Sequence, residues 1–428
     1  MKLQTVVHSA HLAWNVDMRE VRRFTLKVYI AVNGLGLGHI IRCQEIAKEL
    51  ARAGFSIQFA TYLDGLDFAR RQKLPVVESI PISYHVRSDG SVDLKTTSAS
   101  SGFSLGVNTF LHQVVREIQN IRRYAPDIIV SDSRLSTVLA ARLLRKPVMT
   151  ILNQYRVLLI HNNQYPTKGL QDKLFLLIAR LGWTFFGVLI GELWCLSNAI
   201  VVPDLPPPLT VSRSNLAIPR MRRHKVHFVG PIVDANFWKK TDRVSLCQKH
   251  GLDKRKKLVY AAVSGPKHER TPLVRKLLPL LTKLPEFNVV VTCGNPAGKT
   301  NPKRVGSATV FQWTDNQDDF FRACDTVISR AGHGTILKVM MLGKPLLLIP
   351  TPFQTEQLAN ATSAHSIGGA IVLDQDSLSI KSLRGAITLI LRDPYYSRKA
   401  TRVARVARGF DATTQCRGII ERLVAHQP

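Results

Sequence analysis

The chain has 428 residues, enough for two or three domains with cores of their own, and its hydrophobic fraction of 45% excludes a disordered protein. The 59 lysines and arginines outnumber the 30 aspartates and glutamates, so the formal net charge of +29 favours an anionic partner: nucleic acid, an acidic membrane surface or a phosphorylated substrate. The six cysteines have no paired spacing, which argues against a zinc ribbon or a disulfide scaffold and fits a reducing cytoplasm best.

The first predicted elements are a buried strand, a glycine-rich turn and a helix. Residues 1–24 have no apolar core of the signal-peptide type, so we expect an N-terminal extension there. Residues 28–55 have the sequence VYIAVNGLGLGHIIRCQEIAKELARAGF, in which Gly54 closes the helix. The free N–H groups at this helix start attract anions, and His39 stands beside them. The glycine spacing differs from the dinucleotide-binding fingerprint, so two interpretations of the turn stay open. It is either a ligand-binding site or a tight turn in which His39 caps the helix.

Further alternation of strands and helices predicts an α/β domain with a parallel sheet over residues 25–205. Strands are expected at 57–61, 127–131 and 148–152, and helices at 107–123 and 134–145. The most apolar segment, 174–202, is interrupted by Arg180 and Glu192, which leaves about half of the ~20 uncharged residues that a spanning helix needs. Two interpretations stay open for this segment: a core helix, or an interfacial helix with the aromatic residues Trp183, Phe185, Phe186 and Trp194.

A proline-rich linker at 206–225 precedes a second alternation of strands and helices over 226–400, and 401–428 is expected to be a C-terminal helical segment. The strands of the second domain are expected at 258–263, 287–292, 309–313, 326–329 and 345–349. Two doubly wound domains joined in this way imply a cleft between the carboxyl ends of their sheets.

The second domain contains a second small-residue turn between a strand and a helix. Residues 311–361 have the sequence FQWTDNQDDFFRACDTVISRAGHGTILKVMMLGKPLLLIPTPFQTEQLANA. The strand at 326–329 runs into Ala331–Thr335 and then a helix, so exposed N–H groups there offer a pocket for a diphosphate. Glu356 and Gln357 follow another strand, where their side chains would be placed to hydrogen-bond sugar hydroxyls.

This pattern, which is most specific between Trp313 and Gln357, resembles the nucleotide-sugar glycosyltransferases with the GT-B fold. They include UDP-sugar transferases that act on small molecules and the lipid-linked N-acetylglucosaminyl transferase of peptidoglycan synthesis. The resemblance covers roughly 27–400. It implies an α/β fold in which two Rossmann-like, doubly wound parallel-sheet domains face a central cleft. It also implies metal-independent transfer of a hexosyl or N-acetylhexosaminyl group from a UDP-sugar, with a lipid-linked molecule as the expected acceptor.

The resemblance assigns roles to particular residues. His39 stands where the family keeps a general base or an acceptor-site histidine, and Asp132 is similar to the aspartate that orients that histidine. Gln312 and Trp313 would lie against the base. Glu356 and Gln357 would bind the donor sugar. The expected donor-binding set also contains Gly38, Ser264, Gly265, Arg330, Gly332, His333, Gly334, Thr335 and Lys338, with the turn at 332–335 and the Ser264–Gly265 turn facing the diphosphate.

One position departs from the family. The uridine-specific members have a glutamate for the ribose hydroxyls on the helix after the second turn, and this chain has Lys338. A lysine only donates hydrogen bonds, whereas a carboxylate accepts from both hydroxyls. UDP remains the expected nucleotide, and an approach of Lys338 to the phosphates is the alternative role for this side chain.

The implied chemistry needs no cofactor beyond the nucleotide sugar. A neutral imidazole takes the acceptor proton, a carboxylate fixes its tautomer, and backbone N–H groups stabilise the leaving diphosphate. No metal site is predicted, since the D-x-D of Asp374 and Asp376 opens a probable helix and fits N-capping better.

Two other functions stay open: a UDP-sugar 2-epimerase of the same fold, and a non-enzymatic binder of nucleic acid. The latter lacks any nucleic-acid module, so no nucleic-acid partner is expected. Charge and the aromatic segment together predict a peripheral protein on the cytoplasmic face of the cell membrane, bound to an anionic surface.

Overall fold

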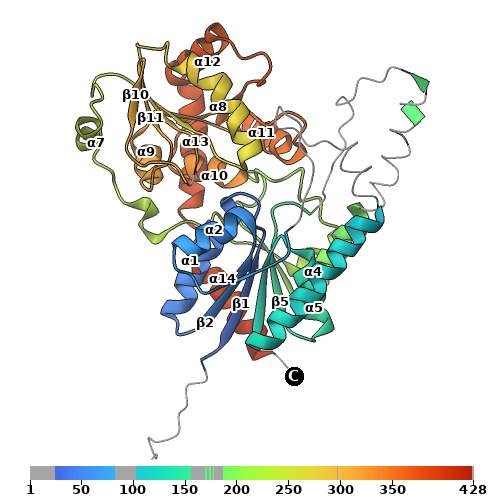
Figure 1. The fold of residues 1–428 in the computed structure, drawn as a ribbon. Coiled ribbons are helices and arrows are strands. Elements are labelled where there is room, and N and C mark those ends of the chain that lie inside the picture. Colours follow the sequence, from blue (N-terminus) through green and yellow to red (C-terminus); the bar gives the residue numbers. More distant parts are fainter. Residues whose placement is uncertain are drawn as a thin grey trace, which may run out of the picture.

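The computed structural model describes residues 25–81, 103–155, 169–170, 173–174, 177, 187–295 and 297–426. They form two seven-stranded sheets, each covered by helices, and the second domain lies above the first in the view of Figure 1. This arrangement confirms the expectation of two doubly wound α/β domains.

The first sheet has the strand order β3-β2-β1-β4-β5-β6-β7, with parallel pairing throughout. The order reverses between β1 and β4, so the carboxyl ends of these two strands form the switch point where ligands bind in such sheets. The strands are β1 (Lys27–Val32), β2 (Ser56–Thr61), β3 (Val76–Glu78), β4 (Ile128–Asp132), β5 (Val148–Ile151), β6 (Ala199–Val202) and β7 (Val226–Phe228). The connecting helices are α1 (Gly38–Arg52), α2 (Leu63–Arg71), α4 (Phe103–Tyr124) and α5 (Leu135–Leu143).

The second sheet has the order β10-β11-β9-β8-β12-β13-β14 and reverses between β8 and β12. Only the edge pair β10–β11 is antiparallel among its described pairs. Its strands are β8 (Leu258–Ala262), β9 (Asn288–Thr292), β10 (Lys303–Val305), β11 (Ala308–Phe311), β12 (Thr326–Ser329), β13 (Leu346–Leu348) and β14 (Ala370–Val372). Its helices are α7 (Arg243–Lys249), α8 (Lys267–Leu281), α9 (Gln317–Ala323), α10 (His333–Met341), α11 (Thr355–Ile367), α12 (Ile380–Arg392) and α13 (Pro394–Ala407). Two 3-10 helices, η1 (Arg220–Lys225) and η2 (Ala235–Trp238), flank β7.

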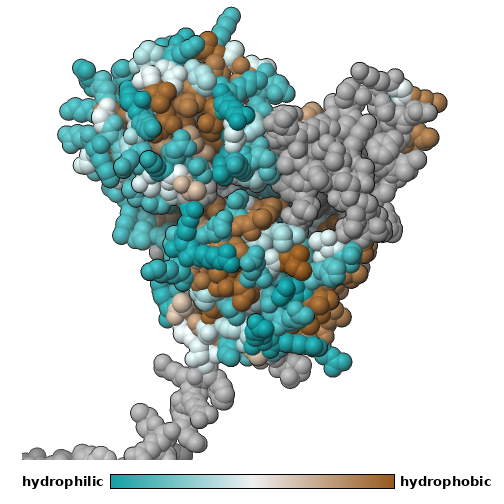
Figure 2. Space-filling model, in the orientation of Figure 1, coloured by the Kyte–Doolittle hydropathy of each residue, from teal (hydrophilic) through white to brown (hydrophobic). Residues whose placement is uncertain are grey.

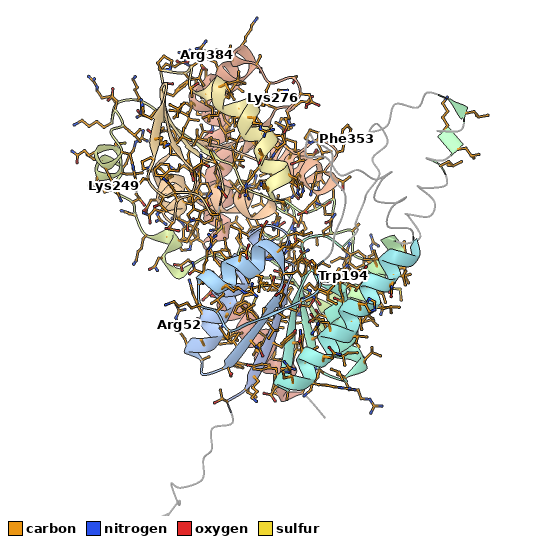
Figure 3. All side chains as sticks on the ribbon, in the orientation of Figure 1. Arg52, Trp194, Lys249, Lys276, Phe353 and Arg384 are labelled. Atoms are coloured by element: carbon orange, nitrogen blue, oxygen red, sulfur yellow. The ribbon has the colours of Figure 1, made fainter. Side chains whose placement is uncertain are left out.

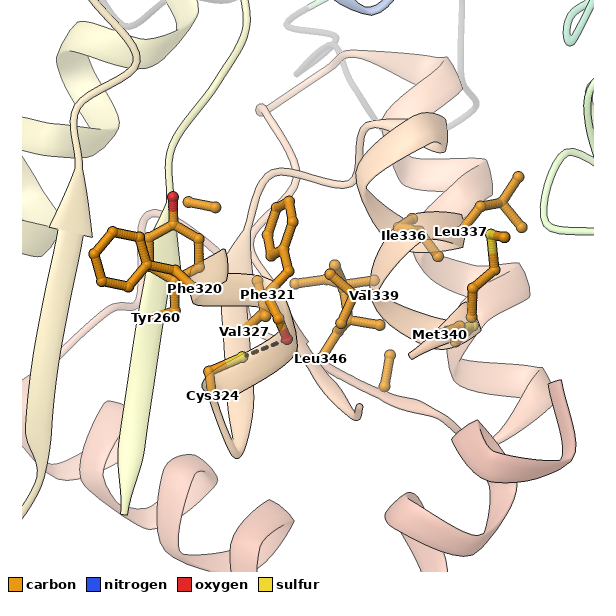
Figure 4. Packing of buried hydrophobic residues seen from close by; sticks show 14 of the residues in the cluster. Tyr260, Phe320, Phe321, Cys324, Val327, Ile336, Leu337, Val339, Met340 and Leu346 are labelled. Carbon is orange, nitrogen blue, oxygen red and sulfur yellow. Dashed lines mark hydrogen bonds between the residues drawn. The ribbon is translucent and has the colours of Figure 1, made fainter. Parts of the chain in front are cut away.

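Apolar packing fixes α9 and α10 against the second sheet (Figure 4). Tyr260 of β8 stacks on Phe320 with ring centroids 5.2 Å apart. The thiol of Cys324 donates to the carbonyl oxygen of Phe321 at 3.3 Å. Because Met340 and its apolar neighbours on α10 belong to the same buried cluster, the start of α10 has a fixed position beside the sheet.

The chain crosses between the domains more often than the sequence predicts. Strand β7 pairs with β6 in the first sheet, so the boundary expected at residue 226 falls before a strand that still belongs to the first domain. The helix α14 (Ala412–Ala425) returns to the first domain and packs on α1, where Arg417 pairs with Glu49 at 2.7 Å. A three-residue strand carries too little periodicity to reveal its sheet.

The apolar segment at 174–202 divides into parts with different environments. Strand β6 is buried in the sheet, and Trp194 packs within the first domain, where Figure 3 labels it. Of the two interpretations, the core one is therefore confirmed for Trp194 and the interfacial one is wrong, because its ring is enclosed by other side chains. Trp183, Phe185 and Phe186 lie outside the described residues. Among the described helices, none carries an apolar run long enough to cross a bilayer.

Candidate active site

The glycine-rich turn after β1 approaches both the first sheet and the second domain. A side chain at Gly34 would collide with the carbonyl oxygen of Tyr62, so only glycine fits there. Gly36 has a φ of +72°, and a Cβ placed on it would lie 3.8 Å from Cδ of Pro266 in the second domain. The turn therefore places the start of α1 beside the second domain.

The strand order brings His39 and Asp132 together. Val32 at the end of β1 pairs with Asp132 at the end of β4, and α1 begins a few residues after β1. Nδ1 of His39 lies 2.8 Å from Oδ1 of Asp132. Asp132 is fully buried, whereas 24% of the His39 side chain is exposed, so the ring is accessible from solvent.

Asp132 also binds a guanidinium and a thiol from α1. Arg42 Nε donates to Oδ2 at 2.5 Å, Arg42 Nη2 contacts Oδ1, and Cys43 Sγ donates to Oδ2 at 3.2 Å. Burial by itself raises the pKa of the Asp132 carboxyl, but Arg42 and His39 outweigh burial and hold that pKa well below its usual range. Asp132 is therefore ionised and only accepts hydrogen bonds, so Nδ1 of His39 carries the proton and Nε2 is free to accept one.

Three helices of the second domain begin at one edge of their sheet. Helices α8, α10 and α11 follow the adjacent strands β8, β12 and β13. A Cβ at Gly332 or Gly334 would meet no atom within 4 Å, so the N–H groups at the start of α10 border open space. Gly265, next to Ser264, has a φ of +106° in the turn before α8. These positive helix ends suit an anion such as a diphosphate, and Thr335 lies in the same first turn of α10.

A buried polar network lies beneath these turns. The Gln357 side-chain oxygen accepts from the Thr351 N–H at 2.8 Å, and its nitrogen donates to Oε2 of Glu269 at 2.8 Å. Arg330 donates to the carbonyl oxygens of Ile349 and Glu269, and burial lowers its pKa to about 10. Gln357 and Arg330 were expected to contact the donor, but their side chains instead form hydrogen bonds within this buried network.

The side chain of His333 also points away from the predicted phosphate position. Its Nε2 lies 3.0 Å from Oδ2 of Asp204, a buried carboxylate that follows β6. The expected phosphate contact of the imidazole is thus replaced by an ion pair or hydrogen bond to the first domain. Only the backbone N–H of His333 remains available at the helix start.

Gln312, Trp313 and Lys338 lie on the flank of the second sheet. Gln312 is exposed and Trp313 is half-buried after β11, with the indole Nε1 donating to Asp315 at 2.8 Å. Lys338 Nζ lies 3.4 Å from Oδ1 of Asp318 on α9. The lysine that departs from the family pattern is therefore paired with a carboxylate of the neighbouring helix.

Glu356 extends from α11 to the first domain. Asn153, just after β5, donates to Oε1 of Glu356 at 2.8 Å, and Arg42 Nη2 lies 3.5 Å from Oδ1 of the same asparagine. A polar chain thus runs from the His39–Asp132 pair to the expected sugar-binding carboxylate. Phe353, just before α11, has a positive φ of 62° and an exposed side chain (Figure 3).

Sequence reasoning missed Arg42, Asn153 and Glu269. Arg42 is one helical turn from His39, a spacing that places both on one face of α1. Asn153 follows the predicted strand at 148–152, just as Glu356 was singled out because it follows a predicted strand. No such signal marks Glu269, whose network depends on the tertiary fold.

The D-x-D segment differs from its predicted role. Asp374 Oδ1 accepts from the Asp376 N–H at 3.0 Å, and α12 begins later with Ser379 as its N-cap in a capping box with Ser382. Ser379 is the more stabilising N-cap, because its hydroxyl accepts from the Ser382 N–H while the Ser382 hydroxyl accepts from the Ser379 N–H. Within the described residues there is no group of three or more His, Cys, Asp or Glu side chains arranged for a metal ion.

Two domain families match separate parts of the chain. Residues 26–181 match the domain described as glycosyl transferase family 1, and residues 270–414 match the glycosyltransferase family 28 C-terminal domain. The first match contains His39 and Asp132, and the second contains the α10 and α11 starts.

Full-length relatives support both matches. An uncharacterised glycosyltransferase of Methanosarcina acetivorans is 26% identical over 404 residues, which cover 93% of this chain and 98% of the relative. The UDP-N-acetylglucosamine–N-acetylmuramyl-(pentapeptide) pyrophosphoryl-undecaprenol N-acetylglucosamine transferase of Clostridium botulinum is 24% identical, with 84% of this chain and 89% of the relative covered.

Solved structures share the fold. The calicheamicin glycosyltransferase CalG4 superposes with a TM-score of 0.62 at 16% identity, over 94% of this chain and 98% of CalG4. MurG of Acinetobacter baumannii superposes with a TM-score of 0.56 at 15% identity, over 93% of this chain and 99% of MurG. At these identities the likeness concerns the fold.

Proposed function

Because the chain is a glycosyltransferase with the GT-B fold, we propose that it transfers a hexosyl or N-acetylhexosaminyl group from a UDP-sugar to a lipid-linked acceptor. The observation that carries the proposal is the His39–Asp132 pair, joined through Arg42 and Asn153 to Glu356 across the cleft. The Clostridium relative, whose name gives a UDP-linked donor and an undecaprenol-linked acceptor, supports these substrate classes.

The proposed reaction has one proton transfer and one displacement. Nε2 of His39 takes the proton of the acceptor hydroxyl, whose oxygen forms a bond to the anomeric carbon while the bond from that carbon to the diphosphate breaks. Asp132 keeps the ring oriented and stabilises the imidazolium that results. The N–H groups at 332–335 and the turn at Ser264–Gly265 stabilise the departing diphosphate without a metal.

A thermal-unfolding screen tests the donor class. Nucleoside diphosphates and nucleotide sugars with uridine, guanosine, thymidine or adenosine are added to the protein, and a ligand at 100 times its Kd should raise the stability by about 2.7 kcal/mol. We expect UDP-sugars to stabilise the protein more than the other classes. Stabilisation by no nucleotide sugar would contradict the proposal.

Glu356 is expected to recognise the sugar of the donor. Glu356→Ala should reduce the affinity for the UDP-sugar to that for UDP alone, because a carboxylate that accepts from sugar hydroxyls is removed. Asn153→Ala, which removes only the bridge to Glu356, should retain the preference for the UDP-sugar. Isothermal titration measures both affinities, and equal losses for UDP and UDP-sugar in Glu356→Ala would exclude this role.

Lys338 is expected to favour nucleotide binding through charge. Lys338→Glu should weaken UDP binding by up to about fivefold, the scale of about 1 kcal/mol, because it places a second carboxylate beside Asp318 and near the diphosphate. Asp318→Asn is the matched control, since it keeps the lysine and removes the neighbouring carboxylate. Tighter UDP binding by Lys338→Glu would instead place this position at the ribose.

The lipid-linked acceptor requires contact with a membrane. Val107, Leu111 and Val115 form an exposed apolar row at helical spacing on α4, and Figure 2 shows hydrophobic residues on this side of the first domain. Combined with the net charge of +29, this face suits an anionic bilayer surface.

Liposome sedimentation tests the membrane contact. We expect wild type to sediment with anionic vesicles and to be released only partly by salt, because the apolar contribution survives screening. Leu111→Ser with Val115→Ser should weaken binding about tenfold or more, since one such buried side chain contributes about 1.5 kcal/mol or more. Leu389→Ser on α12, also exposed, is the control. Wild type that stays in the supernatant at low salt would contradict the contact.

A further inference from the structure

The carboxylate that orients His39 has two basic partners. Arg42 binds Asp132 in a bidentate manner, with Nε donating to Oδ2 and Nη2 donating to Oδ1. His39 shares Oδ1 with Nη2, and Nη2 lies 3.0 Å from Nδ1 of the ring. The Arg42 side chain is almost buried and Asp132 is fully buried, so solvent screens these charges little.

The charges of this cluster balance when His39 is neutral. Asp132 contributes one negative charge and Arg42 one positive charge, so a proton on Nε2 of His39 makes the cluster net positive. A histidine beside an aspartate alone would instead gain an ion pair on protonation. Arg42 therefore leaves in place the orienting hydrogen bond that His39 donates to Asp132, while it opposes the imidazolium that the carboxylate would favour.

Two further described ionisable groups lie beside this cluster. On α1 itself the nearest such group is Cys43, whose thiol donates to Asp132 and whose pKa burial raises well above its usual value. From α11, the Glu356 carboxylate accepts from Asn153 and attracts Arg42, so it adds a second negative charge near the guanidinium without replacing the Asp132–Arg42 contact.

The other elements packed on α1 direct their charges elsewhere. Asp64 of α2 faces His268 and Arg270, and Arg417 of α14 pairs with Glu49 at the far end of α1. Near the site, β1 and β2 present apolar or uncharged side chains.

We propose that Arg42 is a positioning residue that holds the Asp132 carboxylate in place and offsets its charge, so that Asp132 orients His39 without favouring the imidazolium as strongly as an unpaired carboxylate would. The inference rests on the proposed function, in which His39 removes the acceptor proton. It assigns to Arg42 an effect on pH dependence that a purely structural arginine would lack.

The pH profile of kcat tests the proposal with Arg42→Gln, Arg42→Lys and the double variant Arg42→Gln, Asp132→Asn. In Arg42→Gln the acidic limb should move up by about one pH unit or more, because an unneutralised carboxylate now favours the imidazolium. Arg42→Lys keeps the charge and should keep the wild-type limb. The double variant lacks both charges and should return the limb toward wild type. It also avoids an unpaired buried carboxylate, so it keeps the test valid if Arg42→Gln unfolds.

An NMR titration of the His39 ring, assigned by the signal that His39→Ala lacks, gives a second readout without turnover. Its midpoint should rise by about one pH unit or more in Arg42→Gln relative to wild type. An unshifted acidic limb and midpoint in Arg42→Gln, with turnover lowered equally at every pH, would overturn the proposal. Unchanged turnover in His39→Ala would instead refute the base role itself, so the two failures are distinguishable.

Discussion

Replacing His39 with alanine is expected to lower kcat by about 10²-fold or more, the usual scale for the loss of a general base. Nucleotide-sugar affinity should change little, because the expected donor contacts, apart from Gly38, belong to the second domain, most of them at the starts of α8, α10 and α11. Steady-state kinetics gives kcat, and calorimetric titration of the donor gives its affinity.

Two further variants test the same prediction, one at the partner of His39 and one as a control. Asp132→Asn should lower kcat less than His39→Ala, since an amide oxygen still accepts from Nδ1 of the ring. His426→Ala, at an exposed position after α14, is the matched control and should behave as wild type. Wild-type turnover in His39→Ala at saturating substrates would place the base elsewhere.

The second large effect is expected in stability. Arg134→Met should lower the free energy of unfolding of the first domain by about 3–5 kcal/mol, because it leaves the carboxylate of Glu117 buried without its cation. Glu117 on α4 also accepts from hydroxyl groups on β1, α5 and the segment after β3, so its charge is satisfied by Tyr29, Ser79, Thr137 and Arg134 together. Urea unfolding monitored by circular dichroism measures the change.

A surface pair provides the control for this prediction. Arg70 and Glu78 lie 3.2 Å apart, but their side chains are 60% and 64% exposed, so Arg70→Met should cost less than about 1 kcal/mol. The double variant Glu117→Leu, Arg134→Met removes both buried charges and should recover much of the loss. A loss in Arg134→Met no larger than in Arg70→Met would contradict the role of the buried pair.

The sequence predicted the elements that position the site because strong local signals mark them. Short apolar runs predict β1, β8 and β12, and small residues after β1 and β12 predict the turns. The family resemblance predicted the pairing of His39 with Asp132, and the structure accounts for it, because β1 and β4 are neighbouring parallel strands whose carboxyl ends share one edge of the sheet.

Side-chain direction was less predictable than position. Arg330, His333 and Gln357 occupy the predicted turns, yet their side chains bond to Glu269, Asp204 and Thr351 inside the fold. Local sequence places a residue at a helix start, but the partners that capture its side chain come from segments far away along the chain. The return of α14 to the first domain is unpredictable for the same reason.

The most direct measurement follows a labelled sugar. Purified protein is incubated with a UDP-sugar radiolabelled in the sugar and with lipids extracted from the source membranes, and the label in the lipid phase is counted against release of UDP. Our account predicts label in lipid with equimolar UDP for wild type, and at least about a hundredfold less for His39→Ala. Equal incorporation by the two proteins, or release of UDP with no label in any acceptor, would contradict it.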